Sequence, residues 1–144
     1  MFLHSLATEL PPATFTQQDC WNIVERSGMR ARLKRRSILI MQTILKGDHG
    51  IATRHFAMPE IERVFDRTSD ELNDAFRAEA PALAGRALSS ALAKAGLEAA
   101  SLDALLICTC TGYLCPGITS YVAEKLGIRQ DAILHDLVGL GCGA

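Results

Sequence analysis

The stretch LDALLICTCTGYLCPGITSYVAEKLGIRQDAILHDLVGLGCGA, residues 102–144, decides the fold. Two apolar runs of strand length, residues 102–109 and 132–138, flank residues 120–126, which favour a short helix stopped by Gly127. Each apolar run is interpreted as a strand buried on both faces, as in a parallel sheet. A strand, a helix and a second strand in this order imply a right-handed crossover. The sequence therefore predicts an α/β fold with a mixed, largely parallel sheet and buried helices.

The first part of the chain predicts four further elements. Residues 2–10 favour a strand that two prolines close. Thr16 is predicted to cap a helix over residues 17–26, because its side-chain oxygen can accept a hydrogen bond from the first turn. Apolar residues near one face predict a second helix over residues 29–45. Residues 51–58 then predict a short strand.

A proline divides the alanine-rich segment that precedes residues 102–144. A helical pattern starts at Ser69, and we expect Pro81 to break it, because proline lacks an N–H and clashes with the preceding turn. Residues 82–95 carry small side chains on all sides, which is typical of a helix packed closely against a sheet. Residues 1–30 are predicted to form an N-terminal strand–helix extension within a single domain.

Composition and charge exclude several classes of protein. The 144 residues are 49% hydrophobic and 22% charged, so disorder is not expected, and the net charge of −1 offers no basic field for nucleic acid. Five cysteines, an odd number, argue against a disulfide framework. We recognise neither a signal peptide nor an apolar stretch long enough to span a bilayer. The expected location is therefore the cytoplasm.

Several basic side chains have either a structural or a binding role. Five of them cluster in the predicted second helix: Arg30, Arg32, Lys34, Arg35 and Arg36. They are interpreted as a solvated helix face, or alternatively as a patch for a phosphorylated ligand. Arg54, on the predicted strand, is expected to be a buried structural arginine with a carboxylate partner.

Cys142 follows the second apolar run in the glycine-rich segment GLGCGA. Small neighbours let backbone and substrate approach its sulfur closely. If a helix followed, its dipole and free N–H groups would favour the thiolate. A thiolate attacks a thioester carbonyl and gives an acyl-enzyme. The alternative interpretation is an inert cysteine buried in a glycine-rich turn.

Four segments resemble, in the same order and at similar spacing, the type III polyketide synthases of the chalcone and stilbene synthase kind. They are GIATRH (50–55), ALAKAGL followed by LD (91–97, 102–103), CTCTGYLCPG (108–117) and GCGA (141–144). In that family they correspond to a Gly-Ile-x-x-Arg segment, a helix-to-strand passage, a Thr-Gly-x-x-x-Pro-Gly type of loop and the nucleophile segment. The resemblance covers residues 33–144.

The resemblance implies a thiolase-like αβαβα layered fold, of which residues 1–144 would be an N-terminal domain without the second half. It implies that Cys142 is the acyl-accepting nucleophile. Cys110 and Thr111 would line the substrate and cyclisation cavity. Cys115 would reach toward the cavity of a partner subunit in a homodimer. For these last three residues, simple packing is the alternative.

The implied activity is an acyltransferase that condenses a starter acyl-CoA with malonyl-CoA through a cysteine thioester. The family's supporting histidine and asparagine come from the C-terminal half and are missing from this chain, so we expect it to have little or no synthase activity alone. Lys46 is the candidate for a CoA phosphate, because it is the one cation in residues 41–48, which precede the Gly-Ile-x-x-Arg segment. No cofactor is expected besides the CoA thioester substrates.

Other functions are also compatible with the sequence. The Cys-x-Cys pair at residues 108 and 110 has no second pair or histidine at ligand spacing, so no metal is expected. The Thr-Gly-x-x-x-Pro-Gly loop favours the polyketide branch over carrier-protein synthases. The alternatives are another thiolase-fold condensing enzyme, such as a ketoacyl carrier-protein synthase III or a hydroxymethylglutaryl-CoA synthase, and a non-catalytic dimerisation or binding half-domain.

Overall fold

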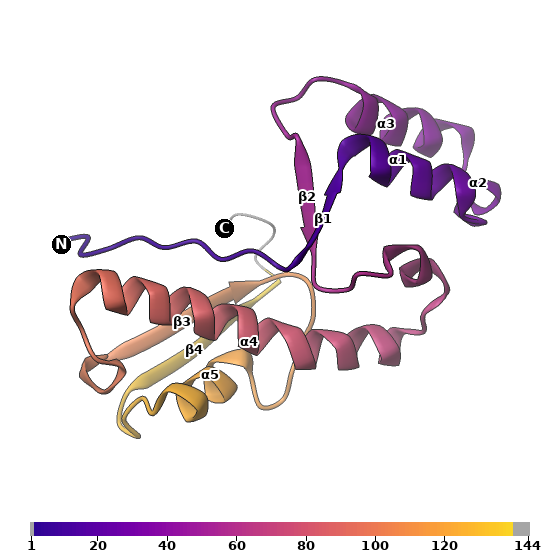
Figure 1. Cartoon of the computed structure of the whole chain (residues 1–144). Helices are drawn as coiled ribbons and strands as arrows, with labels where there is room; N and C mark the ends of the chain where they lie inside the picture. The colour runs from indigo at the N-terminus through magenta and orange to yellow at the C-terminus, as the bar shows by residue number, and fades with distance from the viewer. Residues whose placement is uncertain (1, 140–144) are drawn as a thin grey trace. The chain divides into compact units, whose positions relative to one another are not determined.

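A computed structural model describes residues 2–139 of the chain, and Cys142 lies outside the described residues. The described chain forms two units (Figure 1). We call residues 10–68 the antiparallel-sheet unit, and residues 2–9 with 69–139 the parallel-sheet unit. The predicted 1–30 extension remains a prediction.

The antiparallel-sheet unit pairs two short strands beside helices. β1 (Ala13–Thr16) runs antiparallel to β2 (Thr53–Phe56). The other elements are α1 (Gln17–Arg26), α2 (Met29–Arg32), α3 (Arg35–Lys46) and the 3₁₀ helix η1 (Ile61–Asp66). Its buried apolar side chains are Cys20, Trp21, Ile23, Val24 and Ile61. Four of these five belong to α1, so this helix supplies most of the core.

α1 begins as predicted, at the Thr16 cap. The hydroxyl oxygen of Thr16 accepts a hydrogen bond from the backbone N–H of Asp19 at 3.0 Å. In return the backbone N–H of Thr16 donates to Oδ2 of Asp19 at 2.9 Å. This reciprocal capping box satisfies two N–H groups that have no partner inside the helix.

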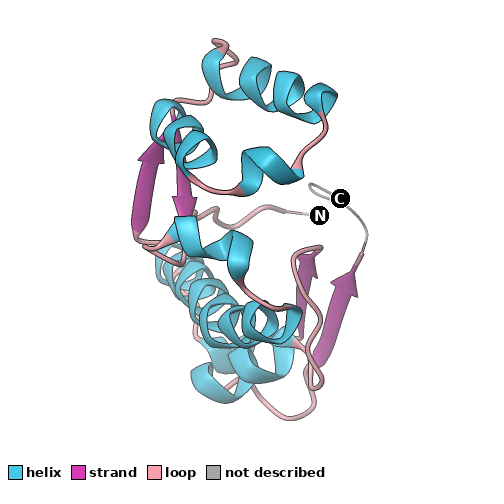
Figure 2. Cartoon of the chain, turned by 90° about the vertical axis from the view of Figure 1, so that its right-hand side faces the viewer, coloured by secondary structure: helices cyan, strands magenta, loops and turns pink. Residues whose placement is uncertain are grey.

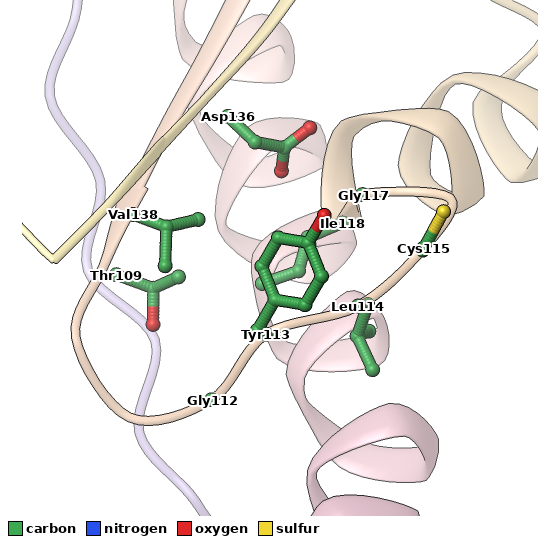
Figure 3. Close-up of a pocket in the computed structure, with 9 residues that line it drawn as sticks. All are labelled: Thr109, Gly112, Tyr113, Leu114, Cys115, Gly117, Ile118, Asp136 and Val138. Atoms are coloured by element: carbon green, nitrogen blue, oxygen red, sulfur yellow. The ribbon is translucent and has the colours of Figure 1, made fainter.

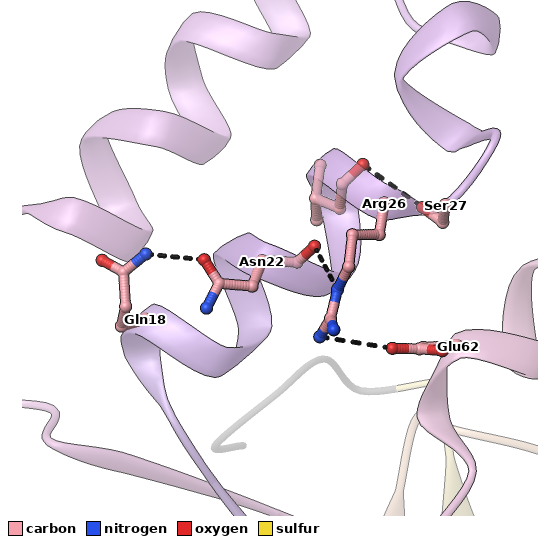
Figure 4. A network of polar contacts seen from close by, with 6 residues as sticks. Gln18, Asn22, Arg26, Ser27 and Glu62 are labelled. Carbon is pink, nitrogen blue, oxygen red and sulfur yellow. Dashed lines mark hydrogen bonds and ion pairs between the residues drawn. The ribbon is translucent and has the colours of Figure 1, made fainter.

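A line of polar contacts follows the exposed side of α1 (Figure 4). Gln18 donates from Nε2 to Oδ1 of Asn22 at 2.8 Å, and the carbonyl of Asn22 accepts from Nε of Arg26 at 3.3 Å. Arg26 also forms an ion pair with Glu62 of η1 at 3.4 Å. Exposed pairs of this kind contribute little free energy, about 0–1 kcal/mol each, so the apolar side chains of α1 dominate the stability of this unit.

The predicted helix over residues 29–45 is wrong as a single element. α2 ends at Arg32, the backbone at Leu33 and Lys34 is extended, and α3 starts at Arg35. A continuous helix would stack like charges four residues apart, at positions 30 and 34 and at 32 and 36. Arg32 turns instead to η1, where it donates to the carbonyl of Phe65 and forms an ion pair with Asp66, both at 3.2 Å.

The parallel-sheet unit holds the predicted strand–helix–strand crossover. β3 (Ala104–Thr109) and β4 (Ile133–Val138) pair in parallel, and α5 (Ile118–Leu126) connects them. α4 (Ser69–Ala95) and α5 lie on the same side of the two strands, as Figures 1 and 2 show from two directions. A short 3₁₀ helix, η2 (Ala99–Ser101), links α4 to β3.

The two faces of this sheet have different surroundings. Leu105 is 8% exposed and packs in one cluster with Leu114, Ile118, Val122 and Ile128. Leu106 points to the other face and is 62% exposed, and Ile133 of β4 is 66% exposed. The prediction that both strands are buried on both faces is therefore wrong for the described chain, because its helices cover one face.

α4 continues through Pro81, so the predicted break is wrong. Pro81 is buried within this 27-residue helix, although an internal proline costs about 3 kcal/mol relative to alanine. The side chains of Ala80, Ala84 and Leu88 on either side pack against the apolar cluster of β3 and α5. This packing outweighs the local cost, since tertiary burial stabilises most helices more than intrinsic propensity does.

Residues 2–10 form no strand, contrary to the prediction. The segment is held on α4 by side chains instead. Ser5 donates its hydroxyl to the carbonyl of Ala91 at 2.7 Å, and Ser90 donates to Oε1 of Glu9 at 2.7 Å. Lys94 donates from Nζ to the carbonyl of Leu6 at 3.1 Å. The strand lies beyond the two prolines, at β1.

Among the described residues, no helix combines the length and the apolar character that crossing a membrane requires.

Replacing Thr16 by alanine is expected to lower the free energy of unfolding of the antiparallel-sheet unit by about 1 kcal/mol, because the Asp19 N–H loses its acceptor. Urea denaturation followed by fluorescence measures it, since Trp21 is the single tryptophan and lies in this unit. Thr14→Ala is the matched control, because the hydroxyl of exposed Thr14 contacts half-buried His55 rather than a helix N–H. Equal losses in both variants would contradict the role of the cap.

The same cap predicts an acid-dependent loss of stability. Hydrogen bonds from the hydroxyl and then the backbone N–H of Thr16 lower the pKa of Asp19 below its ordinary value. Its contribution is thus fully present above the unfolded-state pKa of about 4 and is lost as the pH falls through the lower folded-state pKa. Unfolding measured from pH 7 to pH 2 should show a smaller acid-dependent decrease in Asp19→Asn than in the wild type. An unchanged pH profile in that variant would exclude Asp19 as the cause.

Candidate functional site

A cavity of about 370 Å³ lies in the parallel-sheet unit, where β3 and β4 end. Figure 3 shows its lining residues, which are Thr109, Gly112, Tyr113, Leu114, Cys115, Gly117, Ile118, Asp136 and Val138. Thr109 and Val138 are the last residues of the two strands and pair in register. The carboxyl ends of parallel strands are the usual place for a ligand site in α/β proteins.

The loop of residues 111–117 forms one wall of the cavity. Leu114 anchors the loop in the apolar cluster and is 6% exposed. Gly112 lies under the ring of Phe76 on α4, where an added Cβ would come within 2.5 Å of Cδ1. The loop can approach α4 this closely because residue 112 has no side chain. Tyr113 and Cys115 are left exposed at the cavity (Figure 3).

Asp136 connects this loop to the sheet. Its carboxylate accepts hydrogen bonds from the backbone N–H of Thr119 at 3.2 Å and from the hydroxyl of Thr119 at 2.5 Å. Thr119 is 1% exposed, in the first turn of α5, so a side chain from β4 caps this helix. Asp136 was not among the predicted site residues, although a carboxylate inside an apolar run indicates a buried polar contact.

The structure places the predicted site residues in different environments. Cys115 lines the cavity. Cys110 and Thr111 follow β3 directly and are exposed beside the cavity, outside its lining. Cys142 lies four positions beyond Val138 in the sequence, outside the described residues. The substrate-binding roles of Cys110, Thr111 and Cys115 therefore stay predictions.

Lys46 lies in the other unit, at the end of α3. Its Nζ is 4.7 Å from the centre of the Trp21 ring, which is within the range of a cation–π interaction. Arg54 is half-buried, and its Nε donates to Oε1 of Gln17 at 2.8 Å. Among residues 2–139 the predicted carboxylate partner of Arg54 is wrong, because the observed acceptor is an amide oxygen.

The described cysteines differ in exposure and therefore in reactivity. Burial raises the pKa of the Cys20 thiol, which keeps it protonated and inert. Cys108 and Cys115 are exposed. No group of three or more His, Cys, Asp or Glu residues within residues 2–139 is arranged to hold a metal ion.

Comparison with solved structures defines the class of fold. Polyketide synthase PKS-I from the brown alga Ectocarpus siliculosus matches 97% of this chain and 40% of its own, with a TM-score of 0.79 and 20% identity. A type III pentaketide synthase from Neurospora crassa matches 97% of this chain and 37% of its own, with a TM-score of 0.77 and 25% identity. The chain has the mixed α/β, thiolase-like fold of these enzymes, as predicted.

Comparison with curated sequences identifies homologous proteins. The 1,3,6,8-tetrahydroxynaphthalene synthase of Streptomyces peucetius subsp. caesius is 33% identical over 140 residues, 94% of this chain and 35% of that protein. The 3,5-dihydroxyphenylacetyl-CoA synthase of Streptomyces toyocaensis is 28% identical over 142 residues, 96% of this chain and 34% of that protein. The chain is thus homologous to type III polyketide synthases and spans about a third of their length, as a piece from their N-terminal part would. No protein-family model matches the chain.

Two glycine substitutions are expected to change stability in opposite directions. Gly112→Ala should destabilise the parallel-sheet unit by about 1–3 kcal/mol, because the new Cβ collides with Phe76. Gly85→Ala, inside α4 with open space at its Cβ position, should stabilise the unit by up to about 1 kcal/mol. Hydrogen exchange of the β3 amides measures both effects. A shift of the same sign in both variants would show that Gly112 does not provide the close approach to α4.

Proposed function

We propose that the chain supplies the nucleophile and part of the substrate cavity of a condensing acyltransferase that makes polyketides from acyl-CoA and malonyl-CoA. The observation that carries this proposal is the relationship to 1,3,6,8-tetrahydroxynaphthalene synthase over 94% of the chain. The glycine-flanked Cys142 supports it, because it follows a strand that ends at a cavity. The choice of starter unit and the number of extension steps are determined by the whole protein and not by this chain alone.

The proposed chemistry assigns one step to Cys142. Its thiolate Sγ bonds to the carbonyl carbon of the starter thioester, and CoA leaves as a thiol after taking up a proton. Malonyl-CoA then loses CO₂, and the resulting carbanion attacks the acyl carbon. A carbon–carbon bond forms, and the Cys142 thiolate leaves. Donors that stabilise the oxyanion and the enolate are expected from a histidine and an asparagine beyond this chain.

Substrate binding is assigned to the cavity. The exposed Tyr113 and Cys115 and the strand-end residues Thr109 and Val138 offer walls that are partly apolar and partly polar, which suits an acyl chain with few polar groups. Cys110 and Thr111 are proposed to contact the growing chain, and Lys46 a CoA phosphate. We also propose that the protein forms a homodimer and is located in the cytoplasm.

A second candidate is a ketoacyl carrier-protein synthase of type III. The β-ketoacyl-[acyl-carrier-protein] synthase III 2 of Streptomyces avermitilis is 38% identical over 86 residues, 59% of this chain and 22% of that protein. Such an enzyme would use the same cysteine chemistry with a different acyl carrier. The polyketide assignment takes precedence because its relatives match a larger share of the chain.

Alkylation by iodoacetamide near neutral pH tests the role of Cys142 when it is carried out on the complete protein, in which the expected histidine and asparagine are present. Peptide mass spectrometry should show Cys142 reacting faster than the other four thiols, because a poised thiolate is the reactive species. Exposed Cys108 is the internal reference for an ordinary thiol, and buried Cys20 the reference for a protected one. Cys142→Ala should abolish the fast phase. Reaction of Cys142 at the rate of Cys108 would overturn the proposal and support a non-catalytic binding half-domain.

A further inference from the structure

Asp136 contacts three parts of the parallel-sheet unit at once. It belongs to β4 and pairs in register with Ile107 of β3. Its carboxylate bonds to Thr119 at the start of α5. The same carboxylate lies directly over Gly117, where any Cβ would overlap Oδ2. One side chain therefore joins the end of the loop, the first turn of α5 and the strand that precedes Cys142.

The chemistry of these contacts is specific to a short carboxylate. Both oxygens of Asp136 accept from donors of Thr119, which is 1% exposed, and charge-assisted bonds of this kind are about twice as strong as neutral ones. The N-terminal turn of α5 also favours a negative charge at this position. Residue 117 has no side chain, so the carboxylate can reach the helix.

The position of the loop follows from these contacts. Gly117 ends the loop of residues 111–117, and Leu114 is buried in the apolar cluster. Between these two points lies Cys115, and both Cys115 and Asp136 line the cavity (Figure 3). A shift of Gly117 away from β4 would therefore move the Cys115 wall relative to Val138 on the opposite side.

We propose that Asp136 is a positioning residue that holds the loop of residues 111–117 at the end of β4 and thereby sets the width of the cavity. The consequence for the acyl chain that enters the cavity rests on the function proposed above. The positioning of the loop does not depend on that function, and it can be measured without any substrate.

Hydrogen exchange of the 144-residue chain, followed by mass spectrometry, tests the proposal. In Asp136→Ala, peptides covering residues 111–120 should exchange at least about tenfold faster, the factor expected for the loss of a hydrogen bond to a charged group. Gly117→Ala should produce the same local effect, because its Cβ displaces the carboxylate. Asp136→Asn should give a smaller rise than Asp136→Ala, since its amide can still bond the Thr119 hydroxyl and backbone N–H, but through neutral bonds that are about half as strong.

Asp131→Ala is the matched control. It removes a carboxylate near the start of β4 that forms an exposed ion pair with Arg129 at 3.0 Å, and it should leave exchange in residues 111–120 unchanged. An unchanged rate in Asp136→Ala would overturn the proposal. An equal rise in β3 and α4 would also overturn it, because Asp136 would then stabilise the unit as a whole. Slow alkylation of Cys142 would count against the proposed function and leave this result intact.

Discussion

The parallel pairing of β3 with β4 is the constraint on which the candidate site depends. Parallel strands need a long crossover, and α5 with the preceding loop provides it on the face that α4 also covers. Because both strands run in the same direction, Thr109 and Val138 end side by side. The loop that leaves β3 and the segment that leaves β4 toward Cys142 consequently start from neighbouring positions. The cavity lies at these strand ends because of that geometry. Asp136 determines how closely the loop that forms its wall approaches β4, and Gly112 how closely it approaches α4.

Much of this arrangement could be predicted from the sequence. The apolar runs predicted both strands of the parallel sheet, Gly127 marked the C-terminal end of α5, and the Thr16 hydroxyl marked the start of α1. Each of these signals is local, since it depends on residues within a few positions of one another. The glycine-flanked Cys142 was recognisable as a candidate nucleophile for the same reason, although its surroundings lie outside the described residues.

The errors arose where distant residues decide the local conformation. Pro81 stays inside α4 because an apolar cluster from β3 and α5 covers the helix, and no neighbour of Pro81 in the sequence indicates this. The extended backbone at Leu33 and Lys34 accompanies contacts of Arg32 with η1, more than thirty residues away. Asp136 was overlooked because its partner, Thr119, lies 17 positions earlier in the sequence. Periodicity cannot report such pairs.

The contacts of the N-terminal segment with α4 also constrain the order in which the chain can fold. Ser5 and Ala91 are 86 residues apart, and the complete antiparallel-sheet unit is inserted between them. On a ribosome, this inserted unit emerges and can form its core around α1 while α4 is still being synthesised. Residues 2–9 must remain unattached until the second half of α4 has left the exit tunnel. Their docking therefore closes a long loop, a late step whose rate depends on loop-closure entropy rather than on local helix formation.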